Sequence, residues 1–209
     1  MNVVLFGASG MIGSRVLQEL VRRGHSVIAA ARRPEKIPQA TGITAVEADA
    51  DDPTSVAAAA DGADVAVCAI APPQDHPFRI AGTVTSLMDG LARAGVKRLI
   101  VVGGAGSLEV ATGIQAVDTP EFPAEWLGIA RAHREILPLL KASRFDWSYF
   151  SPAAMIQPGE RTGKFRLGSK ELLTDAKGES RISAEDYAVA LADELERPRH
   201  LNRQFTVAY

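Results

Sequence analysis

Short apolar runs alternate along this chain with longer segments in which apolar residues recur every three or four positions. Runs such as VVLF near the start are typical of buried strands, and the recurring spacing is typical of amphipathic helices. The pattern predicts strands at 3–6, 26–31, 43–47, 63–70, 98–102 and 145–150, and helices at 14–23, 53–60, 78–94, 124–141 and 183–197. This alternation favours an α/β fold: a Rossmann-like, doubly wound parallel sheet flanked by helices.

Two irregular stretches interrupt the alternation. Residues 104–123 form a connection longer than ordinary loops of this fold, and such lengths are typical of lids and binding loops. Residues 157–181 alternate well enough for one or two extra strands, with bends at Gly163 and Gly168. We therefore expect both stretches to border a substrate pocket.

The C-terminal part continues with a helix and a strand. Ser183, with Asp186 at the third helical position, is a variant of the capping box, and the closing RQFTVAY predicts a final strand. We expect one domain over 1–209, with a core at about 1–152 and a small extension at about 153–209 that caps the substrate side.

A glycine-rich turn, GASGMIG, joins the first strand to the first helix. Gly7 allows a sharp turn off the strand, Gly10 lets a pyrophosphate approach bare main chain, and Gly13 lets the helix pack closely on the strand. The unpaired N–H groups of the helix then face the anion. Because the required strand and helix flank the glycines, we favour a dinucleotide site over a plain turn. The residues expected to bind are Gly7, Ala8, Ser9, Gly10, Met11, Ile12 and Gly13.

The ends of the second and third strands carry charged residues that bear on the cofactor. Sites that prefer NAD place a carboxylate after the second strand, whereas this chain has Arg32 and Arg33. A guanidinium pair suits a phosphate and favours NADP(H), with NAD(H) possible, although most arginine pairs before a turn are only solvated. Asp49, followed by Ala50, could accept a hydrogen bond from the adenine amino group, or it is one surface acid among several.

Ligands of such sheets bind beyond the carboxyl ends of the strands, near the point where the strand order reverses. The loops after the fourth, fifth and sixth strands are therefore further candidates for cofactor contacts. The residues expected there are Ile70, Ala71, Pro72, Gly103, Gly104, Ser151, Pro152, Ala153 and Ala154.

Two residues are candidates for catalysis. Ser107 closes the GGAGS loop after the fifth strand, where a hydroxyl could reach a substrate carbonyl, or it is an ordinary turn serine. His133 shares one predicted helix face with the apolar positions Trp126, Ala130, Leu137 and Leu140, and that face points inward. It is either a satisfied core residue or a group that hydrogen bonds or gives a proton to substrate.

These motifs together resemble the atypical short-chain dehydrogenase/reductase family, over essentially the whole chain. They are GASGMIG, the ARR after the second strand, VVGGAGS, SPA, GERTGKFRLG and RISAEDYAVALADELE. The nearest subgroup is the NmrA-like NAD(P)H-binding proteins, which include NADH-flavin reductase-like proteins and biliverdin reductase B. The resemblance implies an NAD(P)H-binding site, and it implies a site role for His133, because biliverdin reductase B-like sequences have histidine at the corresponding place.

One departure from the wider family concerns the catalytic tyrosine. Typical short-chain dehydrogenases use a tyrosine with a lysine four residues later, which lowers the tyrosine pKa for proton transfer. Here Ala153 and Leu191 stand four residues after Tyr149 and Tyr187, and Tyr209 is the last residue. Alcohol dehydrogenation or epimerisation by that mechanism is therefore disfavoured.

Charge and composition disfavour several classes of partner. The net charge is −2 with no basic block, which disfavours nucleic acid and anionic membranes, and no apolar run has the length of a membrane span. Because Met1 stands almost directly before a core strand, we expect no signal peptide and a cytoplasmic location. Cys68 is expected to be a buried small hydrophobic residue, and His25, His76 and His200 lack the spacing of metal ligands.

The sequence thus predicts an NADPH-dependent reductase, monomeric or homodimeric, that passes hydride to a small planar acceptor such as a flavin or quinone. Such acceptors delocalise the added charge themselves, which fits the missing tyrosine and lysine. Two alternatives stay open. One is a redox sensor that binds NADP(H) without turnover, and the other is an epimerase or dehydratase with a different acid.

Overall fold

The computed structural model describes all 209 residues. Its centre is an eight-stranded sheet in the order β10-β12-β8-β5-β4-β1-β2-β3. All of these strands are parallel except β10, which lies antiparallel beside β12. Their bounds are β1 Asn2–Phe6, β2 Ser26–Ala31, β3 Ile43–Glu47, β4 Val65–Cys68, β5 Arg98–Val102, β8 Asp146–Ser151, β10 Arg166–Gly168 and β12 Arg203–Ala208.

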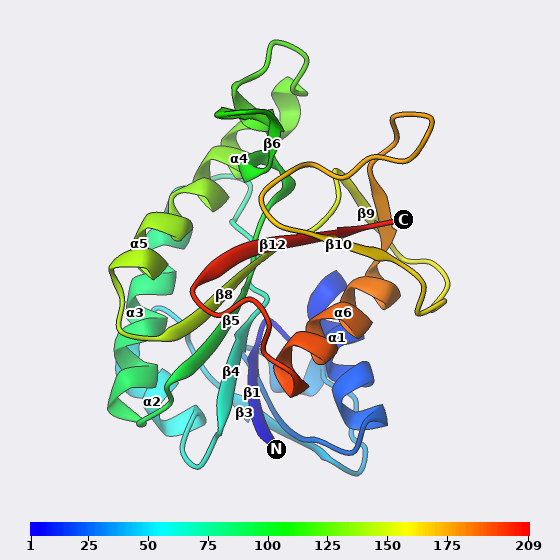
Figure 1. The fold of residues 1–209 in the computed structure, drawn as a ribbon. Helices are drawn as coiled ribbons and strands as arrows, with labels where there is room; N and C mark the ends of the chain where they lie inside the picture. Colours follow the sequence, from blue (N-terminus) through cyan, green and yellow to red (C-terminus); the bar gives the residue numbers. More distant parts are fainter.

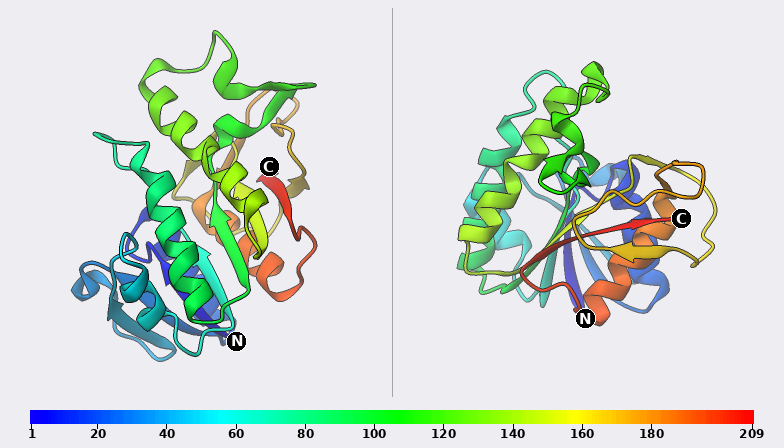
Figure 2. Two further views of the ribbon diagram at one scale, coloured as in Figure 1. Left: turned by 90° about the vertical axis from the view of Figure 1, so that its left-hand side faces the viewer. Right: turned by 45° about the horizontal axis from the view of Figure 1, so that its top comes forward.

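Helices cover both faces of the sheet (Figures 1 and 2). Helices α1 and α6 lie on one face, and α2, α3, α4 and α5 lie on the other (Figure 1). Their bounds are α1 Met11–Arg22, α2 Pro53–Ala59, α3 Arg79–Arg93, α4 Leu127–Arg134, α5 Ile136–Ala142 and α6 Ala184–Glu196. The doubly wound parallel α/β sheet predicted from the sequence is confirmed.

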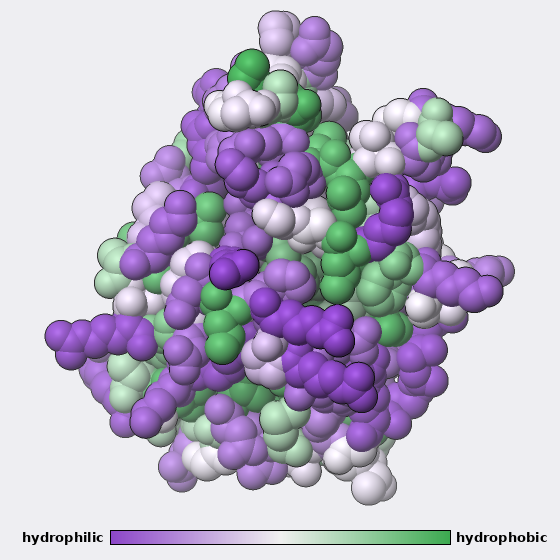
Figure 3. All heavy atoms as spheres, viewed as in Figure 1, coloured by the Kyte–Doolittle hydropathy of each residue, from purple (hydrophilic) through white to green (hydrophobic).

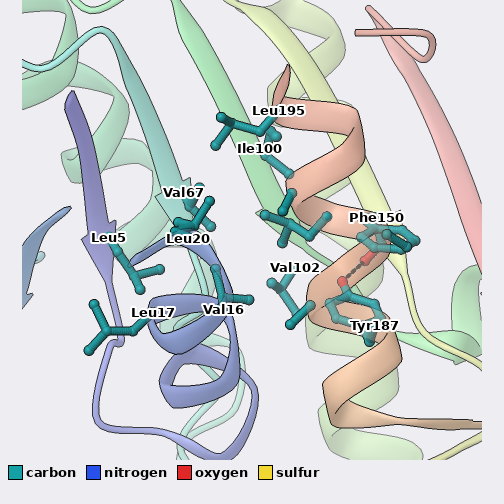
Figure 4. Packing of buried hydrophobic residues seen from close by; sticks show 14 of the residues in the cluster. Leu5, Val16, Leu17, Leu20, Val67, Ile100, Val102, Phe150, Tyr187 and Leu195 are labelled. Carbon is teal, nitrogen blue, oxygen red and sulfur yellow. Dashed lines mark hydrogen bonds between the residues drawn. The ribbon is translucent and has the colours of Figure 1, made fainter. Parts of the chain in front are cut away.

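The sheet is buried from both sides because its central strands are apolar without alternation. All four residues of β4 are buried, although the strand is shorter than the predicted 63–70. Side chains of α1 such as Val16 and Leu20 pack on the face that carries Leu5 and Val67 (Figure 4). Cys68 is buried as expected, and burial raises the pKa of its thiol to about 11.

The C-terminal helix and strand are built into this core. Phe150 of β8 stacks on Tyr187 of α6 and on Phe205 of β12, with ring centroids 4.1 Å apart in both pairs. The Tyr187 hydroxyl also donates to the Phe150 carbonyl at 2.6 Å (Figure 4). Ser183 caps α6 as expected, because its Oγ accepts from the Asp186 N–H at 3.0 Å. Residues that the sequence assigns to an extension therefore widen the sheet and its helical layer.

The helix predicted over 124–141 is not continuous, and this prediction was wrong. A short 3-10 turn comes first, and α4 and α5 are separated at Glu135. Pro138 explains the break, since it has no N–H to donate to the Arg134 carbonyl and its ring would clash with that carbonyl. Trp126 belongs to the 3-10 turn before α4 rather than to the inward helix face that the sequence predicted, and it is 51% exposed.

Small elements surround the open end of the sheet. The connection 104–123 contains a short hairpin of β6 Glu109–Ala111 and β7 Ile114–Gln115, which rises above the sheet in Figure 1. The C-terminal stretch contributes β9 Met155–Gln157 and β11 Arg181–Ser183, which pair with each other. The face in Figure 3 is mostly hydrophilic, with a narrow apolar band toward these loops.

Candidate functional site

A cleft of about 490 Å³ lies at the carboxyl ends of the parallel strands. Its walls come from the loops after β1, β2, β3, β4 and β5 and from helices α3 and α4. This is where ligands bind in doubly wound sheets, since the strand order reverses between β1 and β4. The predicted residues that line it are Gly7, Ser9, Gly10, Met11, Ile12, Arg32, Asp49, Ala50, Ile70, Ala71, Gly103 and His133.

Three glycines follow β1, and a different physical constraint applies to each of them. Gly7 has φ +85°, and an added Cβ would lie 2.6 Å from the Ala69 carbonyl oxygen. Gly13 abuts the Gly7 carbonyl so closely that any Cβ would overlap it. Gly10, in contrast, has φ −76° and ψ 171°, which any residue adopts, and its Cβ would meet only the Gly7 oxygen at 3.3 Å. The fold needs the first two glycines, whereas Gly10 keeps the cleft clear.

The start of α1 is open to an anion. Gly10, its N-cap, provides no side-chain hydrogen bond, and no acidic residue lies in the first turn. The first backbone N–H groups of a helix have no partner within the helix and carry a partial positive charge. Together with bare main chain at Gly10, they form a cradle that suits a pyrophosphate. The residues present therefore fit a dinucleotide.

The cleft end near β2 and β3, here called the arginine end, is exposed and charged. Arg32 and Arg33 follow β2, and neither forms an ion pair or hydrogen bond with another side chain. Arg32 lines the cleft, while Arg33 lies outside its lining. Asp49 Oδ1 accepts from the Asp51 N–H at 3.0 Å, which leaves its second oxygen without a protein partner.

The opposite end, here called the histidine end, is lined by Gly103 after β5 and His133 of α4. An added Cβ on Gly103 would lie 2.5 Å from the Tyr149 ring, and one on Gly104 would lie 3.1 Å from His133 Cβ. Gly103 therefore requires glycine, and at Gly104 a larger residue would have to displace His133 slightly. Gly104 itself stands behind the cleft surface.

The His133 ring is buried but unsatisfied. Its Nδ1 has no hydrogen-bond partner in the protein, and the residue is 9% exposed. Burial lowers the pKa of its imidazole to about 4, because desolvation penalises the charged form. At neutral pH this wall of the cleft is thus an uncharged imidazole, with its Nδ1 enclosed by protein and without a partner.

Ser107 does not reach the cleft surface. It is buried behind the Gly103–Gly104 segment, where its Oγ donates to the Gly104 carbonyl at 2.9 Å and accepts from Gln204 Nε2 at 2.9 Å. Gln204 also donates to Ser151 Oγ at 3.0 Å. The structure therefore does not bring Ser107 and His133 together as two walls of one pocket. Ser107 instead fixes the loop that His133 packs against.

The hydroxyls of all three tyrosines form hydrogen bonds within the protein. The Tyr149 hydroxyl donates to the His133 carbonyl at 2.9 Å and accepts from the Gly104 N–H at 3.3 Å, and burial raises its pKa to about 12. Tyr187 is held by Phe150, and the Tyr209 hydroxyl donates to Asp186 at 2.9 Å. No tyrosine lines the cleft. The Tyr149 phenol joins Gly104 to α4.

The remaining predicted residues lie outside the lining of the cleft. Those after β8 are buried except for Ala154, which is exposed on the far side of the segment. Pro72 is buried, and its neighbour Pro73 lines the cleft in its place. The predicted residues outside the lining are Ala8, Gly13, Arg33, Pro72, Gly104, Ser107, Ser151, Pro152, Ala153 and Ala154.

Three polar residues of the cleft were missed by sequence reasoning: Asp51, Arg79 and Thr83. Asp51 stands in the acidic stretch EADADDP, and the other two open a helix after an irregular loop. No spacing in the sequence indicates that the loop after β3 and the start of α3 meet. Away from the cleft, none of the helices combines the length and the apolar composition that a membrane span requires.

Comparisons with known proteins agree with this geometry. Residues 7–198 match the model of a family described as NAD(P)H-binding. A Burkholderia pseudomallei structure named “putative exported protein” is 47% identical, with TM-score 0.92 and 100% of both chains covered. A Bacteroides thetaiotaomicron “putative epimerase” is 40% identical, with TM-score 0.93 and coverage of 100% and 96%.

A third solved structure, from Streptococcus pneumoniae, is named “putative NADH-flavin reductase”. It is 32% identical, with TM-score 0.89, and the match covers 100% of this chain and 99% of that one. The family model and these neighbours support the resemblance drawn from the motifs. The chain therefore belongs to the NAD(P)H-binding family, within the atypical, NmrA-like short-chain dehydrogenase/reductases.

Proposed function

We propose that the protein is an NADPH-dependent reductase that passes hydride to a small planar acceptor such as a flavin or quinone. The observation that carries the proposal is the make-up of the cleft. Its arginine end combines an uncapped helix start with unpaired cations, and its histidine end offers a neutral imidazole and no tyrosine. This set binds a dinucleotide phosphate and leaves little acid-base chemistry to the protein.

The preference for NADPH rests on the end of β2. A carboxylate there would accept hydrogen bonds from the ribose of NAD(H), but Ala31 is followed by two exposed arginines without partners. Guanidinium groups match a phosphate in charge and in the geometry of their donors. Because Arg32 lines the cleft and Arg33 does not, we assign the larger share of the 2′-phosphate contact to Arg32.

At the histidine end the residues orient rather than react. When bound, reduced nicotinamide supplies the hydride. His133 lines the cleft and is neutral, and its Nε2, unlike the enclosed Nδ1, is the ring nitrogen suited to hydrogen bond to an acceptor that docks there. Ser107 acts on the site through the Gly104 carbonyl and is therefore a positioning residue in this proposal.

The class of acceptor follows from what the cleft lacks. An aldehyde or ketone needs a proton as the hydride arrives, and no tyrosine lines the cleft to give one. Flavins and quinones delocalise the added charge over their own heteroatoms, so water can supply the proton. The name of the Streptococcus pneumoniae relative points the same way.

Two alternatives share the same cofactor site. A redox sensor would bind NADPH in the cleft without turnover. An epimerase, as the name of the Bacteroides relative suggests, or a dehydratase would need another acid, because no tyrosine lines the cleft. Cytoplasmic location and a monomeric or homodimeric state stay predictions, and one similar structure is named an exported protein.

A panel of acceptors tests the proposal. NADPH oxidation is followed anaerobically with FMN, quinones, aldehydes and sugar nucleotides, each at the same enzyme concentration. We expect turnover with FMN or quinones and much less with aldehydes. Tight NADPH binding without oxidation or product in any mixture would favour the sensor. Conversion of a sugar nucleotide without net NADPH oxidation, detected by chromatography of the products, would favour the epimerase.

A further inference from the structure

A polar contact bridges the mouth of the cleft at its arginine end. Asp51 lies on the loop after β3, while Arg79 and Thr83 stand one turn apart at the start of α3. Asp51 Oδ1 accepts from Thr83 Oγ1 at 2.5 Å, and Asp51 Oδ2 lies 3.4 Å from Arg79 Nη2. All three residues line the cleft. One carboxylate therefore ties the loop after β3 to α3 beside the site.

Arg79 stands where the fold alone does not favour an arginine. It is the first residue of α3, and a cation at a helix N-terminus opposes the helix dipole. Its side chain is 67% exposed, and its one ion pair is long and in contact with solvent. Exposed pairs of this kind contribute little to stability. Stability of the fold therefore does not account for an arginine at this position, whereas a ligand in the cleft that Arg79 lines would account for it.

The surroundings of Arg79 favour a neutral planar ligand over a phosphate. The carboxylates of Asp49 and Asp51 flank this part of the cleft and would repel a phosphate, whereas they accept hydrogen bonds from a ring amino group. Ala50 and Ile80 add apolar surface to the same walls. A guanidinium plane stacks well on an aromatic face. A purine would suit this part of the cleft, which combines apolar walls, carboxylates that accept hydrogen bonds and a planar cation.

We propose that Arg79 is a specificity-determining residue that covers the purine ring of the dinucleotide, held in place by Asp51 and Thr83. The proposal rests on the cofactor site of the proposed function but not on any turnover. Arg32 remains the residue for the 2′-phosphate. The two arginines thus act on different parts of the adenosine half.

Equilibrium binding of cofactor fragments tests this assignment. Arg79→Ala is compared with the unmodified protein for NADPH, 5′-AMP, adenosine 2′,5′-bisphosphate and reduced nicotinamide mononucleotide, by calorimetry. We expect the three adenine ligands to bind about three- to tenfold more weakly, as for loss of a cation on an aromatic face. Reduced nicotinamide mononucleotide, which has no purine, should bind unchanged.

Two substitutions at Thr83 test whether binding of the adenine ligands also depends on the residues that hold Arg79 in place. Thr83→Val removes the hydroxyl at nearly constant shape and should weaken the adenine ligands, whereas Thr83→Ser keeps the hydroxyl and should bind them normally. Arg93→Ala is the matched control, since Arg93 lies on α3, is 53% exposed and pairs with Asp89 outside the cleft. It should change no affinity.

Three results would overturn the proposal. They are unchanged affinities in Arg79→Ala, an equal loss for reduced nicotinamide mononucleotide, and a loss confined to ligands with a 2′-phosphate, which would make Arg79 a phosphate contact. Failure of the proposed reductase activity leaves these binding measurements readable, because none of them requires an acceptor.

Discussion

The two ends of the cleft differ in charge, exposure and dependence on distant parts of the chain. At the arginine end, exposed side chains such as Arg32 and Arg79 follow β2 and open α3. At the histidine end, His133 and Gly104 are held by Tyr149, and Ser107 is held by Gln204. The first end selects a ligand by charge, whereas the second presents a fixed, neutral wall.

This difference assigns different tasks to the two ends. Charged, solvated groups discriminate between cofactors because a phosphate gains strong hydrogen bonds from them. A buried, uncharged wall excludes water and fixes geometry, which is what hydride transfer needs from a protein. Substitutions at the arginine end should therefore change affinity, and those at the histidine end should change turnover.

The largest expected effect comes from the helix start that both ends share. Gly10→Val introduces a branched side chain where the pyrophosphate would lie, so we expect NADPH binding to fall below detection. The fold should survive, because Gly10 is exposed and has an ordinary backbone conformation. Titration followed by nicotinamide fluorescence, with a melting curve, measures both. Tight binding in a normally folded variant would contradict the role of the loop.

Gly13→Val serves as the contrasting variant for this experiment. Its side chain would overlap the Gly7 carbonyl within the protein itself. We expect it to lower the melting temperature as well as binding, unlike Gly10→Val. Equal melting temperatures for the two variants would mean that the glycines are not divided between fold and ligand.

The next largest effect should be on turnover, at the histidine end. His133→Ala removes the imidazole from the cleft wall, and we expect kcat to fall by at most about 10², the lower end of the range for acid–base groups, because its role here is to orient the acceptor. NADPH affinity should change little. Ser107→Ala should lower kcat less, because it acts through the Gly104 carbonyl. Full turnover in both variants would remove these residues from the reaction.

Removal of the two arginines after β2, at the arginine end, should change cofactor affinity. Arg32→Ala with Arg33→Ala should weaken NADPH by about 1.5–3 kcal/mol per charged hydrogen bond lost, and NADH hardly at all. The single Arg32 variant should account for most of the loss, because only this arginine lines the cleft. Direct titration with both cofactors measures it. Equal affinities for NADPH and NADH in the unmodified protein would refute the phosphate assignment.

The smallest effect expected is that of pH on the histidine end. Burial holds the pKa of His133 at about 4, below its ordinary 6.5, so turnover between pH 6 and 8 should show no titration of this group. The unfolded chain takes up the proton as pH falls through 6.5, so His133 makes stability fall between pH 6.5 and 4. Melting temperatures across this range should fall less steeply in His133→Asn. A kcat profile with a midpoint near 6.5 that disappears in this variant would contradict the burial.

Much of the fold could be predicted because it depends on local patterns. Strands β2, β3 and β5 have the predicted bounds, since each is an apolar run between clear turn signals. The prediction of one helix over 124–141 is wrong because the apolar spacing continues across Pro138, which interrupts the helical hydrogen bonds. Apolar spacing alone could not show that α4 and α5 are separate helices.

Site residues that lie close in sequence to the ends of β1 and β2 were the most predictable. Gly10 and Arg32 directly follow β1 and β2, and both line the cleft as expected. The position of Ser107 depends on Gln204, which is 97 residues later, and Arg79 meets Asp51 only when α3 packs beside the loop after β3. Contacts of this kind leave no spacing to recognise in a single sequence.

Acceptor-dependent oxidation of NADPH tests the central claim most directly. Anaerobic NADPH consumption is measured together with reduction of FMN or a quinone, with NADH run in parallel. The account predicts that one acceptor is reduced by two electrons for each NADPH consumed, and that NADPH is the better donor. NADPH that binds tightly but is oxidised with neither acceptor would contradict it and leave the protein as a sensor.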